Sequence, residues 1–231
     1  MVHVQRAFRF GIYVLVGCCC LAGWSSASFG KGEPAENFIK RLRAGKYFDL
    51  AITYLDRLEK YPGVNKKILS AIDLEKAQTY IDAAISSGTS KDRDAYFLKA
   101  QGSLSEFLKN KDHERITEAQ MQLGKLQMVR SAQLLIGDPD EEAKAGARAS
   151  LTSASDTFDL VITDLKAKLT EMRKVQIDKK KEPEKAALRD LYQFHYLEAQ
   201  VNSAETRLQA AMTFDDPAKD GKELLLSLIH I

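Results

Sequence analysis

From about residue 34 onward, apolar positions recur every three or four residues along the chain. This spacing indicates amphipathic helices, because an α-helix completes one turn in 3.6 residues. We find no convincing segment with the two-residue alternation of a half-buried strand. The pattern therefore predicts an all-α protein.

Prolines mark the places where this periodicity breaks. A proline inside a helix costs ~3 kcal/mol, so their positions indicate helix boundaries. Short connections between the helices favour antiparallel helical hairpins. The prolines are Pro34, Pro62, Pro139, Pro183 and Pro217, and the expected helices cover about 34–43, 47–60, 66–86, 91–109, 113–136, 140–178 and 184–213.

The two longest expected helices carry apolar stripes that predict a long hairpin with coiled-coil-like packing. The loop 178–184 would close this hairpin. The first stripe comprises Leu151, Phe158, Leu165 and Met172, with Ser155, Ile162 and Leu169 beside it, and the second comprises Leu191, Phe194, Val201, Ala204, Leu208 and Ala211.

Acidic residues beside two of the prolines predict helix starts. Asp138 would cap a helix that has Pro139 at its first position, and the acids that follow would face the positive end of the helix dipole. We interpret the segment 215–217 in the same way. The spacing of these acids does not match a calcium-binding EF-hand loop.

The first 27 residues differ from the rest of the chain. Arg6 and Arg9 precede a 15-residue apolar run from Phe10 to Trp24, and small residues lead up to Ala27. This run is shorter than the ~20 residues of a membrane-spanning helix, so it predicts a signal peptide at 1–27 that is cleaved after Ala27. An uncleaved membrane anchor is the alternative.

All three cysteines of the chain lie inside this leader. Cleavage after Ala27 would leave a mature protein without disulfides, thiolate metal ligands or cysteine nucleophiles. The segment 15–18 also resembles a bacterial lipobox, which would make Cys18 a lipidated N-terminus. Cleavage after Ala27 would export the chain to the periplasm or the cell exterior. Lipidation at Cys18 would export it to the outer membrane as a lipoprotein.

The charge of the chain is balanced once the leader is set aside. The 231 residues are 45% hydrophobic and 29% charged, with 34 basic and 32 acidic residues. Without Arg6 and Arg9 the two signs are equal, so no concentrated basic surface suggests nucleic acid as a partner. A membrane partner is expected only through Cys18 or an uncleaved leader.

The segment 37–62 has the features of a helix-turn-helix unit. Gly45 would form the turn by adopting a positive φ, and the apolar side of the second helix would include Tyr47, Leu50, Ala51 and Leu55. Pro62 would end that helix. Gly45, Tyr47 and Pro62 are spaced as in the second helix of a tetratricopeptide repeat, and Ala51 and Leu55 match its small and bulky positions after a one-residue insertion.

The chain therefore resembles a divergent tetratricopeptide-repeat protein exported by bacteria, although the first helix lacks the tryptophan, leucine and tyrosine of that family. The resemblance implies an α-solenoid in which stacked hairpins form a groove for a protein or peptide partner. Tyr80, Arg93 and Tyr96 are candidates to line the groove, with packing in the core as the alternative.

No pattern in the sequence indicates catalysis, a cofactor or a metal site. His113 and Glu114 begin like a zinc motif, but the second histidine is missing. His195 lies between Phe194 and Tyr196, as expected of a packed histidine. There is no phosphate-binding glycine loop and no nucleophile elbow. We expect no enzymatic activity, cofactor or metal.

The last six residues do not continue the helical pattern. Residues 226–231 read Leu-Ser-Leu-Ile-His-Ile and resemble translated sequencing adapter. We expect a helical-repeat domain at 28–225 and a non-native tail at 226–231, with a native chain that continues further. A short apolar tail is the alternative.

Together these patterns predict an exported scaffold for protein–protein interaction. Three alternatives remain: a lipoprotein assembly factor anchored through Cys18, the docking arm of an enzyme whose catalytic domain follows residue 231, and a coiled-coil structural protein built on 140–213.

Overall fold

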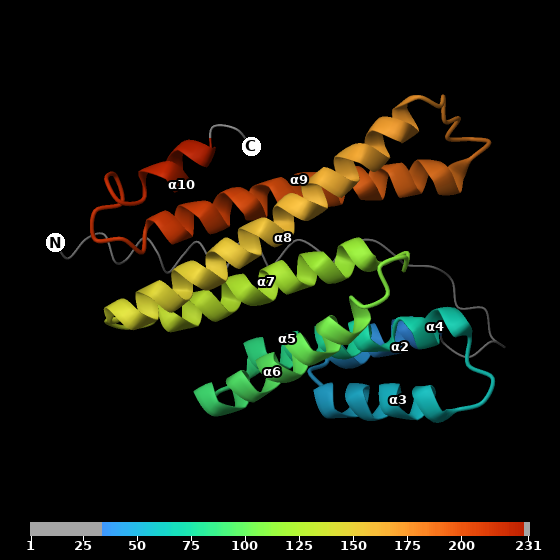
Figure 1. Ribbon diagram of the computed structural model, residues 1–231. Coiled ribbons are helices and arrows are strands. Elements are labelled where there is room, and N and C mark those ends of the chain that lie inside the picture. Colours follow the sequence, from blue (N-terminus) through green and yellow to red (C-terminus); the bar gives the residue numbers. More distant parts are fainter. Residues whose placement is uncertain (1–33, 229–231) are drawn as a thin grey trace. The chain divides into compact units, whose positions relative to one another are not determined.

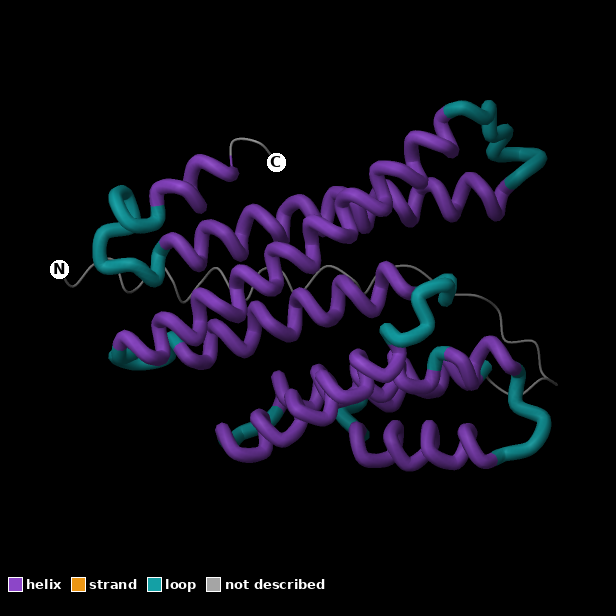
Figure 2. The backbone as a smooth tube through the Cα atoms, viewed as in Figure 1, coloured by secondary structure: helices purple, strands orange, loops and turns teal. Residues whose placement is uncertain are grey.

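The computed structural model describes residues 34–228, which form helices and connecting loops without a strand (Figure 2). The all-α prediction is confirmed. The predicted signal peptide with Cys18 and Ala27, and residues 229–231 of the tail, lie outside the described residues. The helices are α2 (Ala35–Ala44), α3 (Phe48–Lys60), α4 (Lys66–Ser70), α5 (Ile72–Ser86), α6 (Ser90–Phe107), α7 (Ile116–Leu134), α8 (Glu141–Arg173), α9 (Pro183–Ala211) and α10 (Lys222–Ser227).

Successive helices pack as hairpins: α2 with α3, α5 with α6, α7 with α8, and α9 with α10 (Figure 1). The second helix of each hairpin also packs on the first helix of the next, as α8 does on α9. The first helices α2, α5, α7 and α9 contact one another in chain order. Each hairpin thereby covers a face of the next, as in helical-repeat folds.

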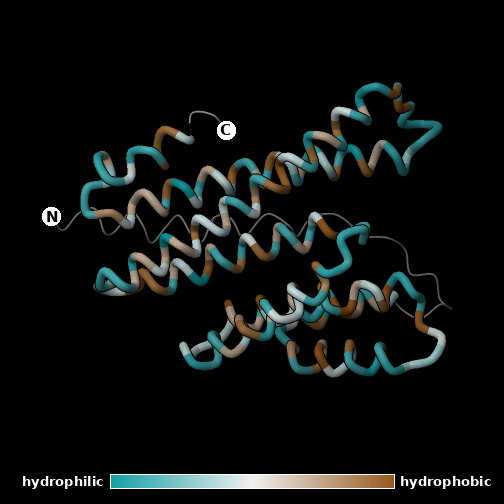
Figure 3. The backbone as a smooth tube through the Cα atoms, viewed as in Figure 1, coloured by the Kyte–Doolittle hydropathy of each residue, from teal (hydrophilic) through white to brown (hydrophobic). Residues whose placement is uncertain are grey.

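Apolar side chains from neighbouring hairpins meet in three buried clusters. The first cluster joins Ile39 of α2, Leu55 of α3 and Ile72 of α5. The second lies between α5, α6 and α7, and the third between α7, α8 and α9. Phe158 of α8 belongs to the third cluster and is fully buried. Hydrophobic and hydrophilic positions recur along the helices, as Figure 3 shows, because one side of each helix meets these clusters.

Two expected helix boundaries are wrong. The expected helix 66–86 divides at Ala71, where α4 ends and α5 begins. The helix expected to reach residue 178 ends at Arg173. Val175, beyond that end, is 58% exposed. A longer helix would therefore bury no apolar side chain there, and packing would not stabilise it.

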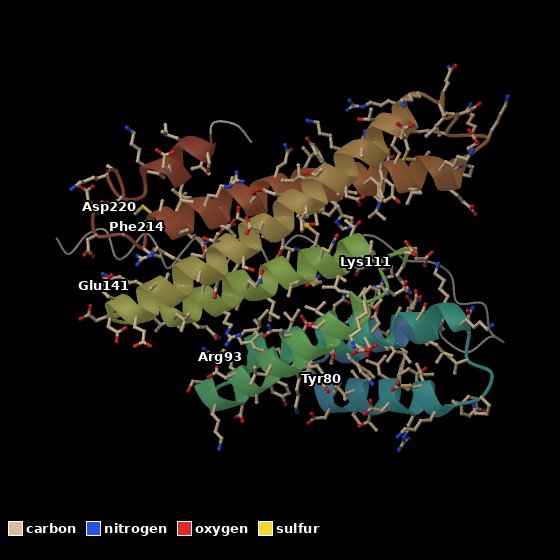
Figure 4. All side chains as sticks on the ribbon, in the orientation of Figure 1. Tyr80, Arg93, Lys111, Glu141, Phe214 and Asp220 are labelled. Carbon is tan, nitrogen blue, oxygen red and sulfur yellow. The ribbon has the colours of Figure 1, made fainter. Side chains whose placement is uncertain are left out.

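The cap of α8 also differs from the expectation. Asp140, not Asp138, is the N-cap, and its Oδ1 accepts the Ala143 N–H at 2.8 Å. Pro139 therefore precedes the helix. Asp215 does not cap a helix either: its Oδ1 lies 2.8 Å from Lys144 Nζ in the first turn of α8. Figure 4 places Glu141 and Phe214 at this shared end of α8 and α9.

The turn between α2 and α3 corrects the role expected of Gly45. The residue with positive φ is Lys46, at 61°, and Gly45 is not in that conformation. A Cβ on Gly45 would lie 2.8 Å from the ring of Tyr47, so the exposed tyrosine ring covers the place where a side chain would begin. Tyr47 and Leu50 are exposed, contrary to the expected inner face, whereas Ala51 and Leu55 are fully buried.

Candidate protein-interaction surface

Helix α9 has apolar residues on two opposite sides. The side that packs into the protein carries small residues, namely Ala199, Ser203, Thr206 and Ala210, which are all buried. The large apolar residues lie on the other side and are exposed. We call them the α9 stripe: Leu191, Phe194, Leu197, Val201, Leu208 and Met212.

The α9 stripe is exposed along its full length. The exposed fractions of its six residues range from 45% for Leu208 to 61% for Leu197. Single exposed apolar residues are common, but a row of large ones at helical spacing indicates an interaction site. This surface corrects the prediction that Leu191, Phe194, Val201 and Leu208 face α8. Ala204 is half-buried and Ala211 is buried.

The reason for this reversal lies in α8. Leu151, Phe158 and Leu165 of its predicted stripe are fully buried, and they fill the space between the helices. Small residues on α9 allow its backbone to approach these bulky side chains. A periodic pattern shows which positions share a side of a helix. Helix α9 has one side of small residues and one side of large apolar residues, and only packing against α8 decides which side is buried.

Polar contacts between α8 and α9 fix this orientation. Ser203 Oγ donates to Asp159 Oδ1 at 2.7 Å, and Arg207 Nη2 lies 2.5 Å from Asp159 Oδ2. Arg207 Nε also donates to Ser155 Oγ at 3.1 Å. Rotating α9 to bury the stripe would break all three contacts, so the exposed side is held outward.

A second set of contacts joins α9 to α7. Lys125 Nζ lies 2.6 Å from Glu198 Oε1, and His195 Nδ1 lies 3.2 Å from Glu198 Oε2. Burial raises the pKa of Glu198, but its contacts with His195 and Lys125 outweigh burial and leave that pKa below its ordinary value. His195 is thus a half-buried residue that orients Glu198, and it has no nucleophile beside it among its described contacts.

The charged residues next to the α9 stripe are acidic. Asp190, Glu198 and Glu205 each lie three or four positions from a stripe residue, which places them on or beside the exposed side. The basic residues of α9 are Lys185, Arg189 and Arg207, and none of them has this spacing. Two of these three carboxylates already have cationic partners. Asp190 lies 3.3 Å from both Arg189 Nη2 and Lys179 Nζ, and Glu198 contacts Lys125. The border of the stripe therefore carries paired charges of both signs.

A buried ionic network joins the first three hairpins. Glu75 of α5 is 4% exposed; its carboxylate lies 2.6 Å from Arg43 Nη1 and 2.8 Å from Arg115 Nη1. Arg115 forms a two-point contact with Glu118 at 2.7 and 2.9 Å, and Gln78 Nε2 donates to Glu118 Oε1 at 2.7 Å. Sequence reasoning missed this network, because its partners are up to 40 positions apart.

The ionic network holds helices together and has no group suited to acid–base catalysis. Burial opposes the charge of Arg115, but Glu118 and Glu75 outweigh this effect and raise its pKa. Burial likewise raises the pKa of Glu118, while the Arg115 contacts outweigh it and lower that pKa overall. Both groups are therefore held in their charged forms. They pin α2, α5 and α7 together and do not supply an acid or base near neutral pH.

The residues expected to line a groove form part of one hairpin. Tyr80 of α5 and Tyr96 of α6 stack with ring centroids 6.3 Å apart, and Lys99 Nζ lies 5.6 and 5.5 Å from the two centroids. Both tyrosines pack partly buried against the core, as the alternative interpretation held. Arg93 is also half-buried; Figure 4 labels it and Tyr80.

A separate pocket of about 290 Å³ opens between α6, α7 and α8. Gln127 Nε2 donates to Ser153 Oγ at 2.8 Å, and Arg130 Nη1 to Gln101 Oε1 at 3.4 Å. The residues that line it include no carboxylate or histidine to act as a general base for the serines.

His113, which the sequence placed at a failed zinc motif, has structural contacts instead. Its Nδ1 accepts the Arg115 N–H at 3.0 Å, so Nε2 carries the proton toward Ser70 Oγ, also at 3.0 Å. Its ring packs edge-on against Phe107 with centroids 4.6 Å apart. Within residues 34–228, no group of three or more His, Cys, Asp or Glu is arranged to hold a metal ion.

Comparison with protein-family models, curated proteins and solved structures gives no match for this chain. Among the described helices, none combines the length and apolar character needed to cross a membrane.

Proposed function

We propose that this chain is an exported helical-repeat scaffold that binds a protein partner through the α9 stripe and performs no catalysis of its own. The observation that carries the proposal is the exposure of six large apolar residues along one side of a helix whose orientation is fixed by Asp159 and Glu198. Such a surface is costly to leave in water and is typical of an interface.

The proposal includes a relationship to tetratricopeptide repeats. The hairpins succeed one another in the manner of a repeat protein, and the first helices contact each other in order. Of the half-repeat motif at Gly45, Tyr47, Ala51, Leu55 and Pro62, the buried Ala51 and Leu55 keep their expected inner positions and support the same relationship. In such arrays neighbouring units bury a shared core and leave extended surfaces for partners.

In-cell cross-linking tests the scaffold proposal. A photoreactive phenylalanine analogue at Val201 should give a discrete adduct with another protein in the source organism. The same analogue at Leu160 of α8, which is 64% exposed, is the matched control. The proposal fails if Val201 gives no more protein adduct than Leu160.

Fractionation tests the export component and its lipoprotein alternative. The cleaved protein should begin after Ala27 and appear in the periplasmic or extracellular fraction. If Cys18 is lipidated instead, the protein should be in the membrane fraction and Cys18→Ala should release it. A cytoplasmic protein that retains residues 1–27 would contradict both forms of export.

A further inference from the structure

We propose that the pocket between α6, α7 and α8 binds a small monocarboxylate with an apolar body, and that Arg130 recognises the carboxylate. This site goes beyond the proposed function, since none of the residues that line it belongs to α9. The inference follows from three features of the pocket: its size and apolar floor, the hydrogen-bond donors around it, and the single positive charge at its rim.

The pocket has the size and the floor of a site for a small ligand. Helices α6 and α8 both pack on α7, which Figure 1 shows between them. Phe97 of α6 and Leu123 and Leu126 of α7 form the apolar part of the lining. Helix α8 contributes only small side chains, which are Ala149, Ser150 and Ser153. The volume of about 290 Å³ lies near the lower end of the ~300–1,000 Å³ typical of ligand pockets, which suits a molecule of about ten non-hydrogen atoms.

Hydrogen-bond donors outnumber the acceptors that a ligand can reach in this pocket. Gln127 Nε2 donates to Ser153 Oγ, so the Ser153 hydroxyl keeps its own proton for a ligand. The Ser150 hydroxyl forms no hydrogen bond with any residue in the part of the chain that the structure describes. Gln101 Oε1 already accepts from Arg130, and Gln127 Oε1 is buried out of a ligand's reach. The pocket therefore favours a ligand with acceptor oxygens.

The charge of the pocket selects a monocarboxylate. Arg130 is the one charged residue in the lining. Its Nη1 donates to Gln101 Oε1 over a long 3.4 Å, and no carboxylate among residues 34–228 pairs with it. The planar guanidinium has five N–H donors and matches the two oxygens of a carboxylate. One positive charge balances one carboxylate, whereas a phosphate monoester would bring nearly two negative charges.

Four small molecules provide the test. Two are carboxylates with apolar bodies of different shape, 3-phenylpropanoate and octanoate. The third, 3-phenylpropanamide, replaces the carboxylate with a neutral amide, and the fourth, inorganic phosphate, has no apolar body. Each is titrated into the full 231-residue chain, and nitrogen–proton NMR correlation spectra follow the backbone amides. We expect at least one carboxylate to bind about tenfold more tightly than the amide and the phosphate, with the largest shifts at residues that line the pocket.

Variants of the chain locate the binding site. Arg130→Gln should weaken binding of the carboxylate about tenfold, because the charge and the two-point contact are lost. Arg57→Gln in α3 removes the same charge from an exposed residue outside the pocket, so binding should not change. Ala149→Leu keeps Arg130 but fills the space, and should weaken binding by a similar factor. Circular dichroism melting of each variant verifies that the helices remain folded.

The inference is overturned if neither carboxylate shows saturable binding, or if the amide or phosphate binds as tightly as the carboxylates. Equal effects of Arg130→Gln and Arg57→Gln would also overturn it. If Arg130→Gln weakens binding and Ala149→Leu does not, the carboxylate binds outside the pocket and the inference fails. All of these outcomes leave the scaffold proposal standing, because cross-linking at Val201 tests a different surface.

Discussion

Gly124 of α7 lies directly against the ring of Phe158 of α8. A Cβ built on Gly124 would be 2.5 Å from Phe158 Cζ and 2.7 Å from Cε1, closer than carbon atoms pack. Phe158 is fully buried and cannot move away without displacing the rest of its cluster. The absence of a side chain at Gly124 therefore sets how closely α7 and α8 approach.

We expect Gly124→Ala to lower the free energy of unfolding by about 1–3 kcal/mol, because overpacking outweighs the better helix propensity of alanine. Urea denaturation measures the change. Gly102→Ala in α6 is the matched control: a Cβ there meets nothing within 4 Å, so stability should rise by about 0.5–1 kcal/mol. Equal effects of the two substitutions would contradict the close contact.

Replacing Glu75 tests the buried ionic network. Glu75→Gln should lower the free energy of unfolding by about 3–5 kcal/mol, because it leaves Arg43 and Arg115 without their shared carboxylate. Thermal and urea denaturation measure the loss. Glu106→Gln removes an exposed pair with Lys109 and should cost less than about 1 kcal/mol. A small effect of Glu75→Gln would show that the network contributes little to stability.

The pH dependence of stability should report Glu118. Its pKa in the folded protein is below the ordinary value of 4.5, so its ionic contacts stabilise the fold above the unfolded-state pKa. That contribution is lost as pH falls through the folded-state pKa. Glu118→Gln should therefore be less stable than the unmodified chain at pH 7, and the difference should shrink between about pH 5 and pH 3. A difference that stays constant over this range would contradict the assignment.

The cap of α8 is tested by a pair of neighbouring aspartates. Asp140→Ala should lower the free energy of unfolding by about 0.5–2 kcal/mol, because the Ala143 N–H loses its acceptor. Asp138→Ala should change it by less than about 0.5 kcal/mol, as expected for a surface position. Denaturation of both variants decides between them, and a larger loss at Asp138 would restore the cap expected from the sequence.

Local patterns in the sequence predicted much of the fold. The all-α class and most helix positions followed from apolar periodicity and prolines, because both act within a few residues. The order of the hairpins followed from short connections. The burial of Leu151, Phe158 and Leu165 in α8 also followed, since that helix has one apolar side to offer.

The candidate site could not be predicted in this way. Helix α9 offers an inner side of small residues and an outer side of large ones, and hydrophobicity alone favoured burial of the large side. The structure buries Ala199, Ser203 and Ala210 instead, because the bulk of α8 leaves room for small side chains only.

The sequence by itself thus determined where helices form, since helix periodicity and backbone breaks are local properties. The tertiary structure alone decided which side of α9 is buried, which aspartate caps α8 and which distant charges pair. The contact of Arg43 with Glu75 spans 32 positions, and that of Lys125 with Glu198 spans 73. The buried side of a helix and the pairing of distant charges depend on close packing between helices. Side chains that meet there must fit one another in volume and in charge.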